Sequence, residues 1–170
     1  MNRMAELAPN KIFLHANWSA YGRQDILNLY KSIKFIQSTL PSAEITIVGS
    51  VPHWLPDLPT YMVKRNLNLS SEHYFANFQV KAFGSLDELL RVIAKENNVK
   101  FFSALNALCE RDKCLATTIY KGKPTLTAWD YGHLTEGGSL LLAEKLLSKE
   151  SNYVTPTFPQ PSAVSDRRPY

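Results

Sequence analysis

Hydrophobic residues along the chain fall into short unbroken runs and into helical spacings, a pattern that predicts alternating strands and helices. The runs 11–18 (KIFLHANW), 44–52 (EITIVGSVP) and 99–104 (VKFFSA) favour buried strands, because they are short and rich in β-branched and aromatic residues. Between 23 and 40 the spacing changes to steps of three and four, which predicts one amphipathic helix ended by Pro41. Its apolar face comprises Ile26, Leu29, Ile33, Ile36 and Leu40.

The rest of the pattern adds two helices, a hairpin and a long connection. Ser85 and Glu88 frame a capping box, so a helix is expected to begin there. Gly122 lies in a turn between TTIY and TLTAW, which predicts a small hairpin, and Thr135 is expected to cap a last helix over about 136–148. Residues 53–80 lack periodicity and predict an irregular connection of the kind that often serves as a lid or binding loop. Its aromatic side chains are Trp54, Tyr61, Tyr74, Phe75 and Phe78.

The order of these elements predicts a single α/β domain over residues 1–150, layered around a parallel sheet. Ligand sites in such sheets lie beyond the carboxyl ends of the strands. This rule places residues 15–18, the loop after Gly49 and the segment after Ala104 along one rim. The tail 151–170 holds four prolines and no periodicity, which predicts disorder.

Composition and charge narrow the class of protein. The 170 residues are 45% hydrophobic and 20% charged, ordinary values for a globular domain. The net charge of +4 is scattered, whereas a nucleic-acid-binding surface needs clustered basic residues, so no nucleic-acid partner is expected. No apolar run reaches 18 residues and the start MNRMAELAPNK has no apolar core, so neither a membrane span nor a signal peptide is expected in this chain.

The segment AWDYGHLTEGG (128–138) carries the main candidate chemistry. Asp130 precedes His133 by three residues, close enough in a tight turn for the carboxylate to hold the imidazole in one tautomer. A histidine held in this way can act as general base towards a hydroxyl nucleophile. The glycines at 137 and 138 permit the backbone of neighbouring segments to approach closely.

Other interpretations of these residue types remain open. The acid–histidine pair also fits a capped surface turn, and His15 or His53 could complete a metal site with it, but no helical spacing of ligands supports metal. The four residues between Cys109 and Cys114 fit either a small disulfide loop or two reduced thiols, and are too many for a redox or zinc pair. No metal or other cofactor is therefore expected.

The chain resembles the SGNH domain of bacterial cell-surface O-acyltransferases in four motifs taken together. These are the strand ends H-A-N-W (15–18) and V-G-S-V-P (48–52), the C-x4-C loop and W-D-Y-G-H-L-T-E-G-G. In that family the domain follows the type 3 multispan membrane acyltransferase module and faces the periplasm. The resemblance covers residues 8–148 and is most specific over 130–137. It implies a three-layer, flavodoxin-like fold that carries a Ser–His–Asp site for acyl transfer.

The resemblance also implies roles for individual residues. By match to the family's last motif, His133 is expected to be the general base and Asp130 the acid that orients it. Asn17 falls where the family places an amide of the oxyanion hole. Here His15 and Trp18 replace the glycine and aspartate of the superfamily's G-x-N-D pattern.

Location and partners follow from the same resemblance. It implies a periplasmic domain of a longer inner-membrane protein, whose partners are the acyl-carrying membrane module and a cell-surface polysaccharide such as lipopolysaccharide. An oxidising periplasm favours a disulfide between Cys109 and Cys114, with their Cα atoms about 4.4–6.8 Å apart.

The family's nucleophile has no counterpart in this chain. It is a serine in a Gly-Asp-Ser motif after the first strand, and no such motif occurs here. We therefore expect the C-terminal part of an SGNH domain, truncated at its N-terminus and inactive alone in ester O-acyl transfer. The missing N-terminal part would be a further partner, and 11–17 would form a sheet edge beside 44–49, with 99–103 beyond. The alternative is a non-catalytic α/β module that binds a glycan or a protein partner.

Overall fold

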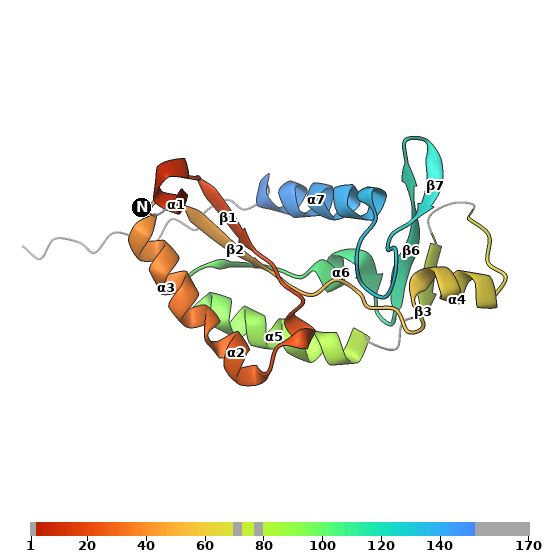
Figure 1. Cartoon of the computed structure of the whole chain (residues 1–170), viewed down its shortest axis with the longest axis horizontal. Helices are drawn as coiled ribbons and strands as arrows, with labels where there is room; N and C mark the ends of the chain where they lie inside the picture. The colour runs from red at the N-terminus through yellow and green to blue at the C-terminus, as the bar shows by residue number, and fades with distance from the viewer. Residues whose placement is uncertain (1–2, 70–72, 77–79, 152–170) are drawn as a thin grey trace, which may run out of the picture.

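The structure, a computed structural model, describes residues 3–69, 73–76 and 80–151 (Figure 1). Its elements in chain order are α1 (Arg3–Leu7), β1 (Lys11–Leu14), the 3₁₀ turn η1 (Trp18–Ala20), α2 (Arg23–Leu27), α3 (Leu29–Thr39), β2 (Glu44–Val48), α4 (Leu58–Lys64), β3 (His73–Ala76), α5 (Val80–Glu96), β4 (Lys100–Phe102), α6 (Ala104–Leu108), β5 (Cys109–Glu110), β6 (Lys113–Tyr120), β7 (Lys123–Leu126) and α7 (Glu136–Ser151). The predicted α/β class is confirmed. Apart from Ser151, the tail for which disorder was predicted lies outside the described residues.

The strands β1, β2 and β4 form a parallel sheet in that order. Lys11 pairs with Glu44, and Thr46 pairs with Lys100. In the described part of the chain β1 is thus a terminal strand, with β2 beside it and β4 beyond, as predicted for 11–17. Because the strands are parallel, their carboxyl ends meet at one edge, where the sequence predicted the site.

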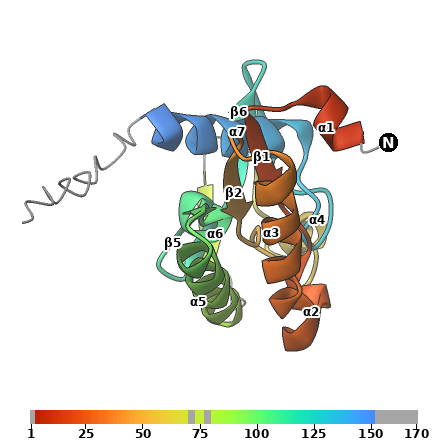
Figure 2. The same cartoon turned by 90° about the vertical axis from the view of Figure 1, so that its left-hand side faces the viewer.

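Helices cover both faces of this sheet, which confirms the layered arrangement (Figures 1 and 2). On one face α2, α3 and α5 pack through buried residues that include Ile33, Ile47, Leu90 and Ile93. On the opposite face lies α7, and the residues in contact there include Val48, Phe102, Leu142 and Leu146. The apolar face predicted for the helical segment after residue 23 is the one that packs on the sheet.

A second sheet, which is antiparallel, lies beyond the carboxyl ends of the parallel strands (Figure 1). Its strand β6 pairs with β3, β5 and β7. The predicted hairpin is confirmed as β6–β7, and its turn residues Lys121 and Gly122 both have positive φ, at 49° and 73°. The hydrophobic pattern indicated this hairpin but not the sheet to which it belongs.

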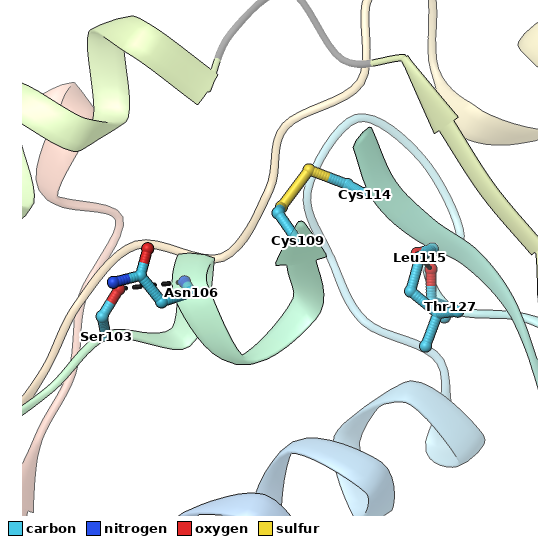
Figure 3. Close-up of a disulfide and its surroundings, with 6 residues drawn as sticks. All are labelled: Ser103, Asn106, Cys109, Cys114, Leu115 and Thr127. Atoms are coloured by element: carbon cyan, nitrogen blue, oxygen red, sulfur yellow. Dashed lines mark hydrogen bonds between the residues drawn. A yellow bond between two sulfur atoms is a disulfide. The ribbon is translucent and has the colours of Figure 1, made fainter. Parts of the chain in front are cut away.

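The predicted disulfide between Cys109 and Cys114 is present, with an S–S distance of 2.04 Å (Figure 3). The Cα atoms are 3.9 Å apart, closer than expected, and the two cysteines lie opposite one another in the β5–β6 ladder. In the same view Ser103 Oγ accepts the Asn106 N–H at 3.0 Å and caps α6. The bridge therefore ties the end of α6 to β6.

Two helix predictions were wrong in their bounds. The single helix expected over 23–40 is divided at Asn28, a residue type that favours turns over helix interiors, into α2 and α3. The helix expected to begin at the capping box begins at Val80, so Ser85 lies inside α5. The box pattern misled because the helix extends five residues before Ser85, so Ser85 lies at an exposed interior position and the Glu88 carboxylate accepts from Arg91.

The irregular connection predicted over 53–80 was also wrong, because it contains α4 and β3. Asp57 caps α4, and its carboxylate accepts the Thr60 N–H at 2.9 Å. The aromatic side chains described here pack into the core: Trp54 and Tyr61 have ring centroids 5.7 Å apart, and Tyr61 and Phe75 6.0 Å. Phe78 and the side chain of Tyr74 lie outside what the structure describes.

Candidate active site

The acid–histidine turn is closed by its own hydrogen bonds. Asp130 Oδ1 accepts the main-chain N–H of Gly132 and of His133, each at 2.9 Å, and Asp130 Oδ2 lies 2.8 Å from His133 Nδ1. The Gly132 N–H first, then the His133 N–H and the His133 side chain, lower the pKa of Asp130 from 3.8 to about 2. The carboxylate is therefore ionised at neutral pH and fixes the ring through Nδ1.

Main-chain bonds hold this turn in place. The Trp129 N–H donates to the His133 carbonyl at 2.8 Å and closes the base of the turn. The Trp54 N–H, from the loop after β2, donates to the Tyr131 carbonyl at 2.6 Å. The turn is therefore attached to the segment that follows the carboxyl end of the parallel sheet.

The start of α7 sets the position of the turn from its other side. Thr135 Oγ1 accepts the Gly138 N–H at 3.1 Å, so the predicted cap is confirmed, and its hydroxyl donates to the Leu126 carbonyl at 2.6 Å. A Cβ at Gly138 would overlap the carbonyl oxygen of Thr127. The close backbone approach predicted for the glycine pair is therefore present, and it lets α7 begin directly against the end of β7.

A pocket of about 190 Å³ lies beside the turn, at the carboxyl ends of β1 and β2. Three segments distant in sequence line it, contributing His15 and Asn17, Ser50 and His53, and Tyr131 and His133. This confirms the rim predicted for 15–18 and for the loop after Gly49, whereas the segment after Ala104 is not among the residues that line the pocket. The His133 side chain is 73% exposed, so its ring is open to solvent.

Asn17 lies at this pocket, three residues after the end of β1 and immediately before η1. Its Oδ1 accepts the Ser19 hydroxyl at 2.8 Å, which leaves the Nδ2 hydrogens to donate elsewhere. His15 Nδ1 and Trp18 Nε1 both bond the Val48 carbonyl, at 3.3 and 2.8 Å. The residues that replace the superfamily's glycine and aspartate thus tie the end of β1 to the end of β2.

The wall formed by the loop after β2 rests on a buried carboxylate that the sequence did not indicate. Asp87 of α5 accepts the Ser50 N–H at 3.3 Å and the Ser103 hydroxyl, and a Cβ at Gly49 would overlap its carboxylate. Burial raises the pKa of Asp87, which the two hydrogen bonds counteract in part. The Ser50 hydroxyl itself is buried and has no hydrogen-bond partner in the described part of the chain.

His53 is a second pocket residue that the pattern alone did not identify, because it was considered only as a metal ligand. Its ring is half-buried and makes edge contacts with Phe83 and Tyr131, at centroid distances of 4.6 and 5.1 Å. Burial first, and then repulsion from His133, lower the pKa of His53, so this ring favours its neutral form. The Cβ position of Gly132 lies 2.7 Å from the His53 ring, so a glycine is needed there.

No group of three or more His, Cys, Asp or Glu side chains in the described ranges is arranged to hold a metal ion. In the same ranges, none of the helices is both long and apolar enough to cross a membrane.

Comparison with known protein families shows which family the chain belongs to. The family model of the SGNH domain fused to AT3 domains matches residues 1–148. The chain belongs to this family. The resemblance inferred from the acid–histidine turn, the cysteine pair and the strand ends is thereby confirmed. No curated protein matches the chain.

Solved structures show the same fold. The periplasmic domain of a lipopolysaccharide acetyltransferase from Salmonella ser. Paratyphi A matches with a TM-score of 0.67 and 26% identity, over 88% of this chain and 60% of that one. A putative platelet activating factor from Streptococcus pneumoniae (TM-score 0.54, 17% identity) is matched over 85% and 60% of the two chains, and a peptidoglycan O-acetylesterase (0.54, 17%) over 89% and 40%. The chain thus spans about 60% of the length of the Salmonella domain.

Proposed function

We propose that this chain supplies the general base, its orienting acid and one oxyanion donor of an SGNH site that transfers an acyl group to a cell-surface glycan. The observation that carries the proposal is the Asp130–His133 pair, bonded at 2.8 Å and placed at the pocket that also holds Asn17. Family membership supports the reaction class, and the Salmonella relative supports acetyl as the acyl group and lipopolysaccharide as the kind of acceptor.

On this proposal each of these groups has a separate task. Asp130 accepts the Nδ1 proton of His133, which leaves Nε2 to take a proton from a hydroxyl nucleophile. The Nδ2 group of Asn17 can donate to the oxygen that becomes negative when the acyl carbonyl is attacked, a contribution of about 2.7–4 kcal/mol in comparable sites. Ser50 offers a further buried hydroxyl at the same wall.

On this proposal the nucleophile comes from a segment outside these 170 residues, which contain no Gly-Asp-Ser. In the described part of the chain β1 is the terminal strand of its sheet, and it ends three residues before Asn17. A strand added parallel to β1 would end beside the pocket and could deliver a serine to His133. We therefore propose that the chain is inactive alone, and that it acts in the periplasm beside the acyl-carrying membrane module that is fused to this family of domains.

A chimera tests this function directly. In it, the part of the Salmonella domain that this chain does not cover would precede residue 1, and acetyl-ester hydrolysis would be measured with 4-methylumbelliferyl acetate. The chimera should be active and the isolated chain inactive. His133→Ala should abolish the activity, and Asp130→Asn should lower kcat by about 10³–10⁴-fold.

Two results would contradict the proposal. One is an acetylesterase activity of the isolated chain that survives His133→Ala. The other is a chimera that is folded by circular dichroism and nevertheless inactive.

A further inference from the structure

A second hollow of about 490 Å³ adjoins the dyad pocket, and His53 lines both. Its other lining residues are Trp18, Ser19 and Tyr21 at the turn after β1, Ile26 of α2, and Phe83 and Leu86 of α5. The Asn17–Ser19 hydrogen bond also connects a residue of the first pocket with a residue of the second hollow. A molecule bound in the second hollow would therefore lie within reach of the acid–histidine pair.

The sizes of the two hollows suggest different occupants. Small-molecule sites usually measure about 300–1,000 Å³, so the dyad pocket at 190 Å³ is small and the second hollow at 490 Å³ lies within the range. A two-carbon acyl group needs only the smaller space. The larger one can take a ring-sized acceptor.

The lining of the second hollow combines apolar faces with a few hydroxyls. Trp18 and Phe83 are buried, at 7% and 5% exposure, whereas Tyr21 is 51% exposed. Ser19 and Tyr21 add hydroxyl groups. Sugar rings have an apolar face and hydroxyl edges, so they match such a surface. A hydrocarbon chain would instead favour a closed, wholly apolar site.

We propose that this second hollow is the acceptor subsite, in which one sugar ring of the polysaccharide lies against Tyr21 and presents a hydroxyl past His53 to His133. The inference rests on the proposed function. When the acyl group is on the serine, His133 takes the proton of the sugar hydroxyl while the new ester C–O bond forms. The bond from the acyl carbon to the serine oxygen then breaks, and the proton passes from His133 to that oxygen. A half-buried, neutral His53 between the hollows keeps a second positive charge away from His133 during this step.

Nuclear magnetic resonance titration of the full chain tests the subsite without any need for activity. The probes are methyl glycosides of glucose, galactose, rhamnose and N-acetylglucosamine, with hexanoate as the acyl-chain comparator. At least one glycoside should shift the Trp18 indole N–H and the Tyr21 resonances. Tyr21→Ala should weaken that binding roughly five- to tenfold, while Phe35→Ala, which removes an equally exposed aromatic ring from α3, should leave it unchanged.

The inference is overturned if no glycoside shifts these resonances, if hexanoate binds there in their place, or if the shifts centre on Trp129, the exposed aromatic on the other side of Asp130. Because resonance mapping locates the ligand on the unmodified chain, the answer does not depend on Tyr21→Ala folding correctly. If no glycoside bound but the chimera were active, the acceptor subsite would be wrong and the proposed function would stand. If glycosides bound but the folded chimera were inactive, the proposed function would be wrong and the sugar-binding hollow would stand.

Discussion

At the scale of single residues, Asp130 shows how a partly exposed carboxylate can be kept ionised by its own turn. Its two strongest partners are main-chain N–H groups, and the imidazole comes only third. Folding lowers its pKa from 3.8 to about 2, so its contribution to stability is complete above pH 3.8 and is lost as the pH falls through 2.

This ordering predicts how Asp130 titrates. The carboxyl carbon of Asp130, followed by ¹³C resonance against pH, should have its midpoint near 2, and the midpoint should stay well below 3.8 in His133→Ala because both N–H donors remain. A midpoint that returned to 3.8 in His133→Ala would show that the imidazole is the main partner, contrary to this account.

Two glycines on helices give opposite predictions for the same substitution. A methyl group at Gly138 meets the Thr127 carbonyl, so Gly138→Ala should destabilise the fold by about 1–3 kcal/mol. Gly84, inside α5, has open space at its Cβ position, so Gly84→Ala should stabilise the fold by about 0.4–1 kcal/mol. Urea unfolding midpoints measure both effects, and equal shifts for the two variants would contradict the packing argument.

At the scale of elements, Asp87 connects three of them. Its carboxylate bonds the loop after β2 and Ser103 at the start of α6, while its backbone belongs to α5. Asp87→Ala leaves a buried N–H and a hydroxyl without their acceptor, and should cost about 1–3 kcal/mol of unfolding free energy. The neighbouring Glu88→Ala, on the exposed side of α5, should change it by less than about 0.5 kcal/mol.

Asp87→Ala should change the structure of the pocket wall as well as the free energy of unfolding. Because Ser50 belongs to the pocket wall, Asp87→Ala should shift the amide resonances of the loop after Gly49, whereas Glu88→Ala should not. A destabilisation without any change at that loop would show that Asp87 acts on packing alone.

At the scale of the whole molecule, the outer edge of β1 is the feature that most affects behaviour in solution. Phe13 is 40% exposed, and a parallel strand with an open edge favours association with another chain. We expect the isolated chain to self-associate at high concentration and to melt below about 65 °C. Phe13→Lys should reduce the association, and Phe35→Lys, on an exposed helix face, should not.

Size-exclusion chromatography with light scattering, together with thermal melting, measures these properties. A monomer at every concentration that melts cooperatively above 65 °C would contradict the idea that β1 needs a partner strand.

The sequence predicted those elements that local sequence patterns encode, and missed those that depend on contacts with distant segments. The parallel strands, the hairpin and the cap at Thr135 were predictable, because runs of apolar residues and turn residues encode them locally. β3 was not, since it becomes a strand only by pairing with β6, about 40 residues later. The start of α5 was placed wrongly because Ser85 and Glu88 match a capping box in sequence, whereas the helix already begins at Val80.

The candidate site also has parts that the sequence predicted and parts that it did not. The bond between Asp130 and His133 was predictable, because three residues in a turn leave the side chains little choice. His53 and the second hollow were not, because their neighbours Phe83 and Tyr131 come from separate elements that only the fold brings together. A histidine five residues after a buried strand, at the carboxyl edge of the sheet, was the one available signal.

The self-contained turn from Asp130 to His133 has a consequence for how such proteins diverge. Its hydrogen bonds close within four neighbouring residues, so insertions in loops or drift in the core leave the acid-to-imidazole spacing unchanged. Most damaging substitutions elsewhere should lower the number of folded molecules in the cell without altering what each folded molecule does. Lineages can thus inherit the acid–histidine turn intact while the walls of the pocket beside it change.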